Sequence, residues 1–373
     1  MNGENLIEII QLSGAIWGKY TLDDFNQGSY HVGMRFPDAI ASHRLRAAFA
    51  MRPGLAPRLF GPTQLDRMHA VADLDEDVTI SDFSRAEPAL LATLDVLVTG
   101  WGCPELGPAE LDAMPGLRAV LHAAGTVKSH VGPDVWSRGI LVTSAADANA
   151  HPVAEYTLAA ILQAGKAVPE LAGGYARDPR FTADDRDDIG NYGRTVGILG
   201  ASRVGRRVVE LLGSFDFNVL LYDPNVGDDD PVLARARPVG LDDLFRRSSI
   251  VSVHAPLLPE TVGLVGRREL GLMRPGSVLI NTARGAIVDH DALAAAVRAD
   301  GLRAVLDVTE PEPLPGGHPL RTLPGVILTP HVAGSLGNEL LRLGESVVRE
   351  LEQLAAGRPP RFPVSGATQA MTA

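Results

Sequence analysis

The amino-acid sequence predicts an α/β protein built on parallel β-sheets, and three observations lead to this prediction. Short apolar segments typical of buried strands alternate with segments whose apolar residues recur every three or four positions, which is the pattern of βα units. This alternation occurs twice, once from residue 44 to about residue 143 and again from residue 195 to about residue 331. A length of 373 residues also corresponds to two or three domains of ordinary size.

The first series begins at Arg44, since residues 1–43 show no clean period and are predicted to be an N-terminal extension. The segment RAAFAM predicts a buried strand at 46–51. The next segment, GPTQLDRMHAVADL, predicts a helix in which Thr63 and Asp66 form a start resembling a capping box. Leu65, Met68 and Ala72 would lie on one face of that helix. Further strands are predicted at 78–80, 96–99, 118–122 and 140–143.

The second series follows a nearly continuous apolar helix predicted at 151–168 and a polar surface loop predicted at 176–194. Its first strand, TVGIL, occupies residues 195–199 and precedes a helix predicted at 206–212. Later strands are predicted at 219–222, 250–253, 278–281, 304–308 and 326–328. Leucine and valine then recur every three or four residues from Leu336 to Leu354, which predicts one long amphipathic helix.

Composition excludes several classes of protein. The chain has 34 Lys and Arg against 45 Asp and Glu, a net charge of −11, and an acidic surface repels nucleic acid. Apolar runs are too short to cross a membrane, and the N-terminus lacks the basic and apolar regions of a signal peptide. Because Cys103 is the only cysteine, no intrachain disulfide can form. We therefore expect a cytoplasmic protein with no nucleic-acid or membrane partner.

A glycine-containing turn follows the strand at 195–199. In GILGASRVG, Gly200, Ser202 and Gly205 stand where a dinucleotide-binding turn has G-x-G-x-x-G, and a helix follows. The next strand ends at Asp223, 18 residues after Gly205, where a carboxylate would bind the adenosine ribose and repel a 2′-phosphate. This favours NAD over NADP. A plain tight turn and a turn-forming role for Asp223 before Pro224 are the alternatives. A serine nucleophile is excluded, because the spacing differs from G-x-S-x-G.

Three polar residues follow predicted strands of the second series: Arg284 in NTARGAIVD, Glu312 in LDVTEPEPL and His331 in LTPHVAGS. Ligands of open α/β sheets bind at the carboxyl ends of the strands. An arginine holds a substrate carboxylate, an imidazolium protonates a carbonyl oxygen, and a neighbouring carboxylate favours that charged imidazole. Together they suit reduction of a 2-oxo acid. Taken singly, each residue could instead cap a strand or lie in a solvated loop.

These segments together resemble the D-isomer-specific 2-hydroxyacid dehydrogenase family, which includes phosphoglycerate, glyoxylate/hydroxypyruvate and D-lactate dehydrogenases. The resemblance covers about residues 44–364 and is most specific after Thr195, in TVGILGASRVG, VLLYDP, SVHAPLLPETVGLVG and the three motifs above. It implies reversible hydride transfer between NADH and a 2-oxo acid. Arg284 would be the catalytic, substrate-binding arginine, His331 the general acid/base and Glu312 the orienting acid.

The resemblance also implies a set of NAD contacts. Arg203 and Val204 would lie over the pyrophosphate beside the glycine turn. The other positions where the family contacts NAD are His254, Ala255, Pro256, Thr261, Thr282, Ala283 and Asp307. Ser202 departs from the family's glycine, and its side chain would either crowd the phosphate or donate a hydrogen bond to it.

Substrate contacts are expected in the first series, where the family binds the substrate carboxylate with a glycine-rich turn. HAAGTVKSHVG keeps Gly125 with unusual flanks, so Ala124, Gly125 and Thr126 are the candidates. Trp101 in TGWGCPE would form a wall against the substrate side chain, or would simply pack at a loop base.

The resemblance implies two doubly wound parallel-sheet domains. A Rossmann NAD-binding domain would span residues 149–335. A flavodoxin-like substrate-binding (catalytic) domain would combine residues 44–148 and 336–373, and the protein would be a homodimer. Three alternatives stay open: a formate dehydrogenase, against which Glu312 argues, a non-catalytic NAD(H)-sensing scaffold of the corepressor type, and a weak nucleotide binder without activity. No metal site is expected, because no two histidines have helical ligand spacing.

Overall fold

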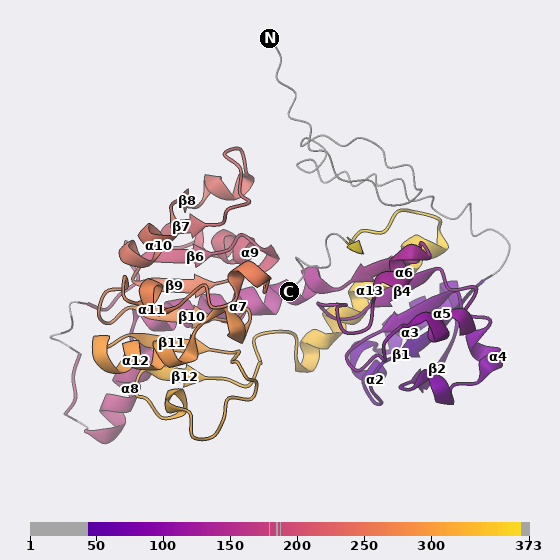
Figure 1. The fold of residues 1–373 in the computed structure, drawn as a ribbon, viewed down its shortest axis with the longest axis horizontal. Coiled ribbons are helices and arrows are strands. Elements are labelled where there is room, and N and C mark those ends of the chain that lie inside the picture. Colours follow the sequence, from indigo (N-terminus) through magenta and orange to yellow (C-terminus); the bar gives the residue numbers. More distant parts are fainter. Residues whose placement is uncertain (1–43, 179, 184–185, 187, 367–373) are drawn as a thin grey trace, which may run out of the picture.

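The computed structural model describes residues 44–178, 180–183, 186 and 188–366, which form two α/β lobes, each built around one sheet (Figure 1). The N-terminal extension predicted at 1–43 lies outside these residues. The two sheets confirm the predicted α/β class with two parallel-sheet units.

The first sheet has the strand order β13-β5-β4-β3-β1-β2. Strands β1 to β5 are parallel, and only β13 pairs antiparallel, against β5. The order 2-1-3-4-5 is that of a flavodoxin-like domain. The strands are β1 (Leu45–Ala50), β2 (Ala72–Ile80), β3 (Val96–Thr99), β4 (Ala119–His122), β5 (Leu141–Ser144) and β13 (Pro363–Val364).

Helices cover both faces of this sheet and bury an apolar core on each. One core includes Met68 together with Leu343 and Leu351 of the C-terminal helix. The other includes Leu91 and Leu111. The helices are α2 (Ala56–Leu59), α3 (Pro62–Val71), α4 (Pro88–Leu91), α5 (Pro108–Ala113), α6 (Pro133–Ser137) and α13 (Leu340–Ala355).

The second sheet is wholly parallel in the order β12-β11-β10-β9-β6-β7-β8. The order reverses between β6 and β9, which is the switch point where doubly wound sheets bind ligands. The strands are β6 (Thr195–Leu199), β7 (Asn218–Tyr222), β8 (Arg237–Pro238), β9 (Ile250–Val253), β10 (Val278–Asn281), β11 (Arg303–Leu306) and β12 (Val326–Leu328).

Two groups of helices sandwich this sheet. On one face α10, α11 and α12 bury residues such as Phe245, Leu270 and Leu293, and on the other α7 and α9 bury Ile161 and Val208. The helices are α7 (Ala146–Gly165), α8 (Val168–Arg177), α9 (Arg203–Leu212), α10 (Leu241–Arg247), α11 (Arg267–Leu270) and α12 (His290–Asp300). Short 3-10 helices lie at Phe83–Arg85, Pro231–Ala234, Pro259–Thr261, Gly285–Ile287, Pro319–Arg321 and Gly337–Glu339.

The C-terminal helix α13 returns to the first sheet, as its yellow ribbon beside α3 shows (Figure 1). Arg67 on α3 binds two carboxylates of α13: its Nη1 lies 2.7 Å from Glu345 Oε2 and its Nη2 lies 2.8 Å from Glu352 Oε2. The first of these contacts joins residues 278 positions apart in the sequence. The domain boundaries at 148/149 and 335/336 stay predictions.

Some predicted boundaries were wrong, each for a local reason. Helix α3 begins at Pro62 with Gly61 as N-cap and without a side-chain cap, so Thr63 and Asp66 form no capping box. It ends at Val71, and Ala72 begins strand β2, which starts six residues before the predicted strand at 78–80. Helix α7 begins at Ala146 rather than 151 and contains Pro152 in its interior. Among the described residues, no helix is long and apolar enough to cross a membrane.

Candidate active site

The glycine turn between β6 and α9 lies at the switch point of the second sheet. Gly200 has φ of +100°, and a Cβ there would lie 2.5 Å from the backbone nitrogen of Ala255. A Cβ on Gly205 would lie 2.0 Å from the carbonyl oxygen of Gly200. Both positions therefore require glycine, and the turn brings the first residues of α9 close to the loop after β9.

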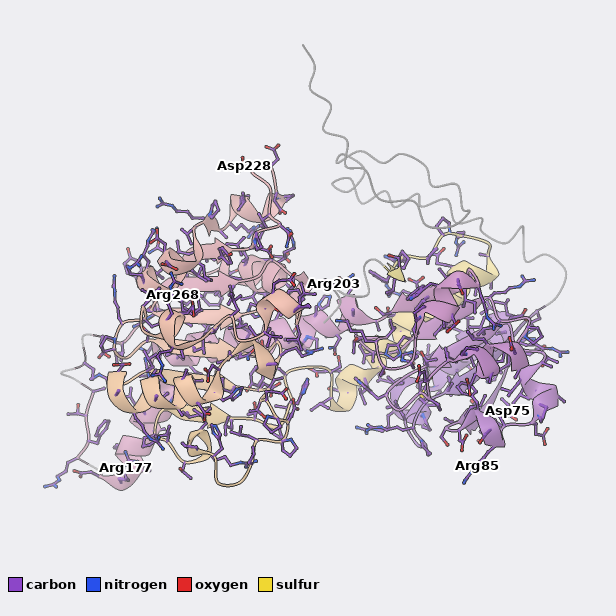
Figure 2. All side chains as sticks on the ribbon, in the orientation of Figure 1. Asp75, Arg85, Arg177, Arg203, Asp228 and Arg268 are labelled. Atoms are coloured by element: carbon purple, nitrogen blue, oxygen red, sulfur yellow. The ribbon has the colours of Figure 1, made fainter. Side chains whose placement is uncertain are left out.

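Ser202 is the N-cap of α9, and its Oγ accepts a hydrogen bond of 3.3 Å from the backbone of Gly205. The helix N-terminus is thereby fixed, and the hydroxyl proton stays available to a ligand oxygen. Arg203 is exposed at the start of α9, on the side of the second lobe that faces the first (Figure 2), and Val204 is half-buried next to it.

Asp223 follows β7 at the same edge of the sheet. Its Oδ2 accepts a hydrogen bond of 2.7 Å from the backbone of Ala201, and its Oδ1 accepts one of 2.9 Å from the backbone of Asn225. The carboxylate is therefore fixed beside the glycine turn, as the predicted ribose contact requires. Each oxygen keeps a second lone pair for a ligand hydroxyl.

The loop after β9 carries the next predicted contacts. His254 is buried beside the glycine turn, and burial lowers its pKa to about 3, so its imidazole is neutral. Its Nε2 lies 2.8 Å from Ser252 Oγ, whereas its buried Nδ1 has no partner among the described residues. Ala255 is buried and Pro256 is half-buried after it. Thr261 Oγ1 donates a hydrogen bond of 2.6 Å to the carbonyl of Pro256 and so closes the loop.

The segment after β10 positions Arg284. Thr282 is buried with its Oγ1 3.0 Å from Thr157 Oγ1 on α7, and Ala283 donates its backbone N–H to Asn281 Oδ1 at 3.0 Å. Asn281 Nδ2 in turn donates to the carbonyl of Arg284 at 2.9 Å. The Asn281 side chain thus bonds the backbones of Ala283 and Arg284 and fixes the turn. The guanidinium of Arg284 donates a hydrogen bond of 2.6 Å to the carbonyl of Ala283.

Glu312 and His331 meet although 19 residues separate them: His331 Nδ1 lies 2.8 Å from Glu312 Oε1. The side chains of His331 and Glu312 are about half exposed, at 49% and 43%. Burial lowers the pKa of Arg284, and the charge of Glu312 opposes this fall, so Arg284 lies within electrostatic range of Glu312. Of the three predicted catalytic residues, Glu312 and His331 are therefore in direct contact.

A buried carboxylate, Asp307, holds the loop that carries His331. Its oxygens accept hydrogen bonds from Thr329 Oγ1 at 2.6 Å and from the backbones of Val332 and Ala333 at 2.8 Å each. His331 has a φ of +55°, a left-handed conformation that is unfavourable for a residue with a Cβ. The Asp307 contacts on both sides of His331 therefore maintain a strained backbone at the position of the imidazole.

The predicted substrate contacts lie at the carboxyl ends of β3 and β4 in the first sheet. Trp101 follows β3 and is 38% exposed. In the described part of the chain, the backbone N–H groups of Ala124, Gly125 and Thr126 donate no hydrogen bond to the protein. Three consecutive amides are thus available for an anionic ligand, as a carboxylate-binding turn requires.

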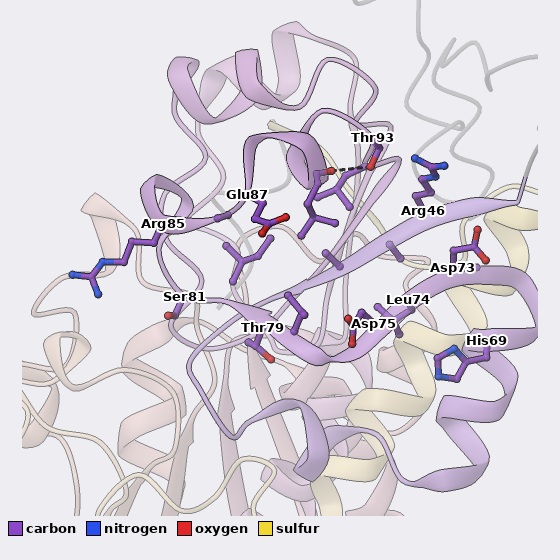
Figure 3. Close-up of a pocket in the computed structure, with 18 of the residues that line it drawn as sticks. Arg46, His69, Asp73, Leu74, Asp75, Thr79, Ser81, Arg85, Glu87 and Thr93 are labelled. Carbon is purple, nitrogen blue, oxygen red and sulfur yellow. Dashed lines mark hydrogen bonds between the residues drawn. The ribbon is translucent and has the colours of Figure 1, made fainter.

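A large cavity lies elsewhere. About 860 Å³ of space opens beside the outer strand β2, lined by charged side chains of both signs that include Arg46, Asp73 and Glu87 (Figure 3). None of the predicted catalytic or binding residues lines it. Within the described ranges, no three His, Cys, Asp or Glu side chains converge as metal ligands.

Three residues that support the site were not predicted from the sequence: Thr329, Tyr156 and Asn281. The hydroxyl of Tyr156 on α7 lies 2.8 Å from Thr329 Oγ1, which extends the Asp307 network into the helix core. Asn281 occurs inside the quoted motif NTARGAIVD, so its polarity was a signal that went unused.

Comparison with known proteins identifies relatives of this chain. Residues 158–333 match the family model of the D-isomer specific 2-hydroxyacid dehydrogenase, NAD binding domain. The chain is 34% identical over 262 residues to the glyoxylate reductase of Thermofilum pendens, covering 67% of this chain and 75% of that protein. It is also 34% identical over 249 residues to the D-3-phosphoglycerate dehydrogenase of Mycobacterium bovis, covering 66% of this chain and 47% of that protein.

Solved structures give the same result. The TT0316 protein from Thermus thermophilus is 30% identical with a TM-score of 0.66, and the match covers 86% of this chain and 100% of that one. A phosphoglycerate oxidoreductase from Rhizobium etli shares the fold with a TM-score of 0.75 at 23% identity, over 87% of this chain and 99% of that one.

The parallel sheets and the glycine turn at the switch point are those of a dinucleotide-binding α/β fold. The chain belongs to the D-isomer specific 2-hydroxyacid dehydrogenase family. It spans about half the length of the phosphoglycerate dehydrogenases that it matches.

Proposed function

We propose that this protein is an NAD-dependent D-2-hydroxyacid dehydrogenase that interconverts a 2-oxo acid and its 2-hydroxy acid. The observation that carries the proposal is the 2.8 Å contact between His331 Nδ1 and Glu312 Oε1 in one cluster with Arg284. His331 would donate the proton, Glu312 would stabilise the charged imidazolium, and Arg284 would bind the substrate carboxylate. Reduction of a 2-oxo acid requires these three roles.

The cofactor site fits NAD. NADH, when bound, supplies the hydride for reduction, and NAD⁺ accepts it in the reverse direction. Gly200 and Gly205 let the turn pack tightly against the loop after β9. Ser202 and the N-terminus of α9 would offer hydrogen-bond donors to the pyrophosphate, and Asp223 would accept hydrogen bonds from the ribose. A negative charge at Asp223 also disfavours a 2′-phosphate, so NADH is the proposed cofactor.

The chain's own residues handle the substrate carboxylate and the proton. The guanidinium of Arg284 would bind the carboxylate together with the amides of residues 124–126, and Trp101 would border the substrate side chain. With Nδ1 bonded to Glu312, His331 Nε2 is the nitrogen that delivers a proton to the carbonyl oxygen. In the reverse direction, Nε2 removes the hydroxyl proton, and the Glu312 carboxylate stabilises the resulting imidazolium.

The proposal also divides the chain into a substrate-binding domain, residues 44–148 and 336–373, and an NAD-binding domain, residues 149–335. The protein would be a homodimer in the cytoplasm. Family resemblance supports the dimer, and the single cysteine supports a reducing compartment. Light scattering of the purified protein measures its mass in solution, and a mass of one 39.5 kDa chain would exclude the dimer.

The deciding experiment follows NADH oxidation at fixed enzyme with glyoxylate, hydroxypyruvate, pyruvate, 2-oxoglutarate, phenylpyruvate and 3-phosphohydroxypyruvate. We expect turnover with at least one of these 2-oxo acids, lost when His331 is replaced by alanine. Tight NADH binding without turnover of any 2-oxo acid would contradict the proposal and favour an NAD(H)-sensing scaffold.

A further inference from the structure

Helix α7 packs in the cores of both lobes (Figure 1). Ala148, near the start of the helix, packs against the core of the first lobe, whereas Ala154 and Ile161 lie in the core of the second. With 20 residues the helix is about 30 Å long. It is therefore a single regular element to which parts of both lobes are attached.

The residue before α7 fixes the predicted carboxylate turn of the first lobe. Ala145 is the N-cap of the helix, and its backbone N–H lies 2.9 Å from the carbonyl oxygen of His122 and 3.0 Å from that of Ala124. Ala124 is the first residue of the turn 124–126, whose amides are the proposed carboxylate site. The position of this turn is therefore tied to the start of α7.

Two side chains of α7 hold the loop that carries His331. Asn149 Oδ1 accepts a hydrogen bond of 2.9 Å from the backbone of Ser335, after His331 in the sequence. The hydroxyl of Tyr156 lies 2.8 Å from Oγ1 of Thr329, before His331. Asn149 and Tyr156 are about two helical turns apart and share one face of α7. The loop is therefore bonded to this face on both sides of the imidazole.

The hydroxyl of Tyr156 is the donor in its contact with Thr329. Thr329 Oγ1 gives its single proton to Asp307 Oδ1, because a carboxylate oxygen accepts. Two hydroxyls therefore form a chain from α7 to the carboxylate, and hydrogen bonds in such a chain strengthen one another. Asp307 in turn accepts from the backbones of Val332 and Ala333. The chain thus extends from α7 to the backbone that follows the imidazole.

We propose that Tyr156 and Asn149 are positioning residues through which α7 sets the place of the His331 imidazole relative to the carboxylate turn of the first lobe. The inference rests on the proposed function, because it takes His331 as the proton donor and the turn 124–126 as the carboxylate site. Proton transfer requires the imidazole within hydrogen-bond reach of the carbonyl oxygen, so a small displacement of the loop lowers kcat more than it weakens substrate binding.

The test measures kcat and KM with the best 2-oxo acid of the panel. Tyr156→Phe removes only the hydroxyl, and kcat should fall about tenfold, as expected for one lost hydrogen bond, while KM stays within about twofold. Asn149→Ala should have the same effect. Asn149→Asp, whose carboxylate can still accept the N–H of Ser335, should restore most of kcat.

Tyr192→Phe is the matched control, because Tyr192 is 90% exposed in the turn before β6, and its kcat should equal that of the wild type. In a Thr329→Val background, Tyr156→Phe should cause no further loss of kcat, because its hydroxyl has already lost its partner. A further loss in that background would overturn the inference. Unchanged kcat in Tyr156→Phe and Asn149→Ala, or a raised KM at unchanged kcat, would also overturn it.

Hydrogen exchange separates this inference from the proposed activity. Mass spectrometry of a peptide covering residues 329–335 needs no turnover, and its amides should exchange faster in Tyr156→Phe and Asn149→Ala than in the wild type and Tyr192→Phe. Faster exchange in a protein that reduces no 2-oxo acid would support the attachment of the loop to α7 and contradict the proposed function. Turnover with unchanged exchange and unchanged kcat in both variants would support the proposed function and contradict the positioning role.

Discussion

Replacing Asp307 by asparagine tests how the fold positions the acid/base. The Asp307 carboxylate accepts two hydrogen bonds on Oδ1, from Thr329 and Val332, and one on Oδ2, from Ala333. An asparagine oxygen can keep the first two, but its Nδ2 then faces the N–H of Ala333, so two donors oppose each other. Loss of one charged hydrogen bond and a buried unsatisfied pair together cost about 3–5 kcal/mol.

We expect Asp307→Asn to lower the free energy of unfolding by about this amount in urea. Because the strained backbone of His331 would relax and move the imidazole, kcat should also fall about a hundredfold. Asp228→Asn, at an exposed loop position (Figure 2), is the control and should change neither quantity. Wild-type kcat in Asp307→Asn would refute a positioning role for this carboxylate.

Three further predictions concern stability and the cofactor. Burial lowers the pKa of His130 from its ordinary value of 6.5 to about 4. As the pH falls, the His130 imidazole of the unfolded chain therefore takes up a proton before that of the folded protein does. Stability should therefore be lost between pH 6.5 and pH 4, by about 3 kcal/mol for this group, and His130→Gln should flatten this part of the urea-derived stability profile. Gly200→Ala, which would place a Cβ 2.5 Å from Ala255, should weaken NADH binding in a fluorescence titration, whereas unchanged affinity would count against the turn as the pyrophosphate site. Asp223→Ala should narrow the preference for NADH over NADPH in kcat/KM, and an unchanged ratio would mean that another residue selects the cofactor.

The sequence predicted the buried strands best, because their apolar side chains leave a continuous signal. The strands at 195–199, 250–253 and 278–281 agree with β6, β9 and β10 residue for residue. Strand β2 was mostly missed, because its segment ADLDED at the sheet edge is largely exposed and has no apolar pattern. The helix predicted from residue 151 begins five residues earlier, at Ala146, and contains Pro152.

The sequence predicted the site residues that lie in local motifs, because their residue types indicate chemistry. It did not predict the contacts that hold them in place. Arg284, Glu312 and His331 each follow a strand of the second sheet, and the parallel order of these strands brings them together. The three hydrogen bonds of the Asp307 carboxylate depend on tertiary packing between residues far apart in the sequence. No local pattern encodes those distances.

The central claim is that His331 transfers the proton and does not hold the cofactor. The most direct test measures both kcat with the best 2-oxo acid and the dissociation constant of NADH for His331→Ala and the wild-type protein. We predict that kcat falls by about a hundredfold or more, as for loss of a general acid, while the NADH dissociation constant stays within about twofold. Retained turnover in His331→Ala would contradict the account.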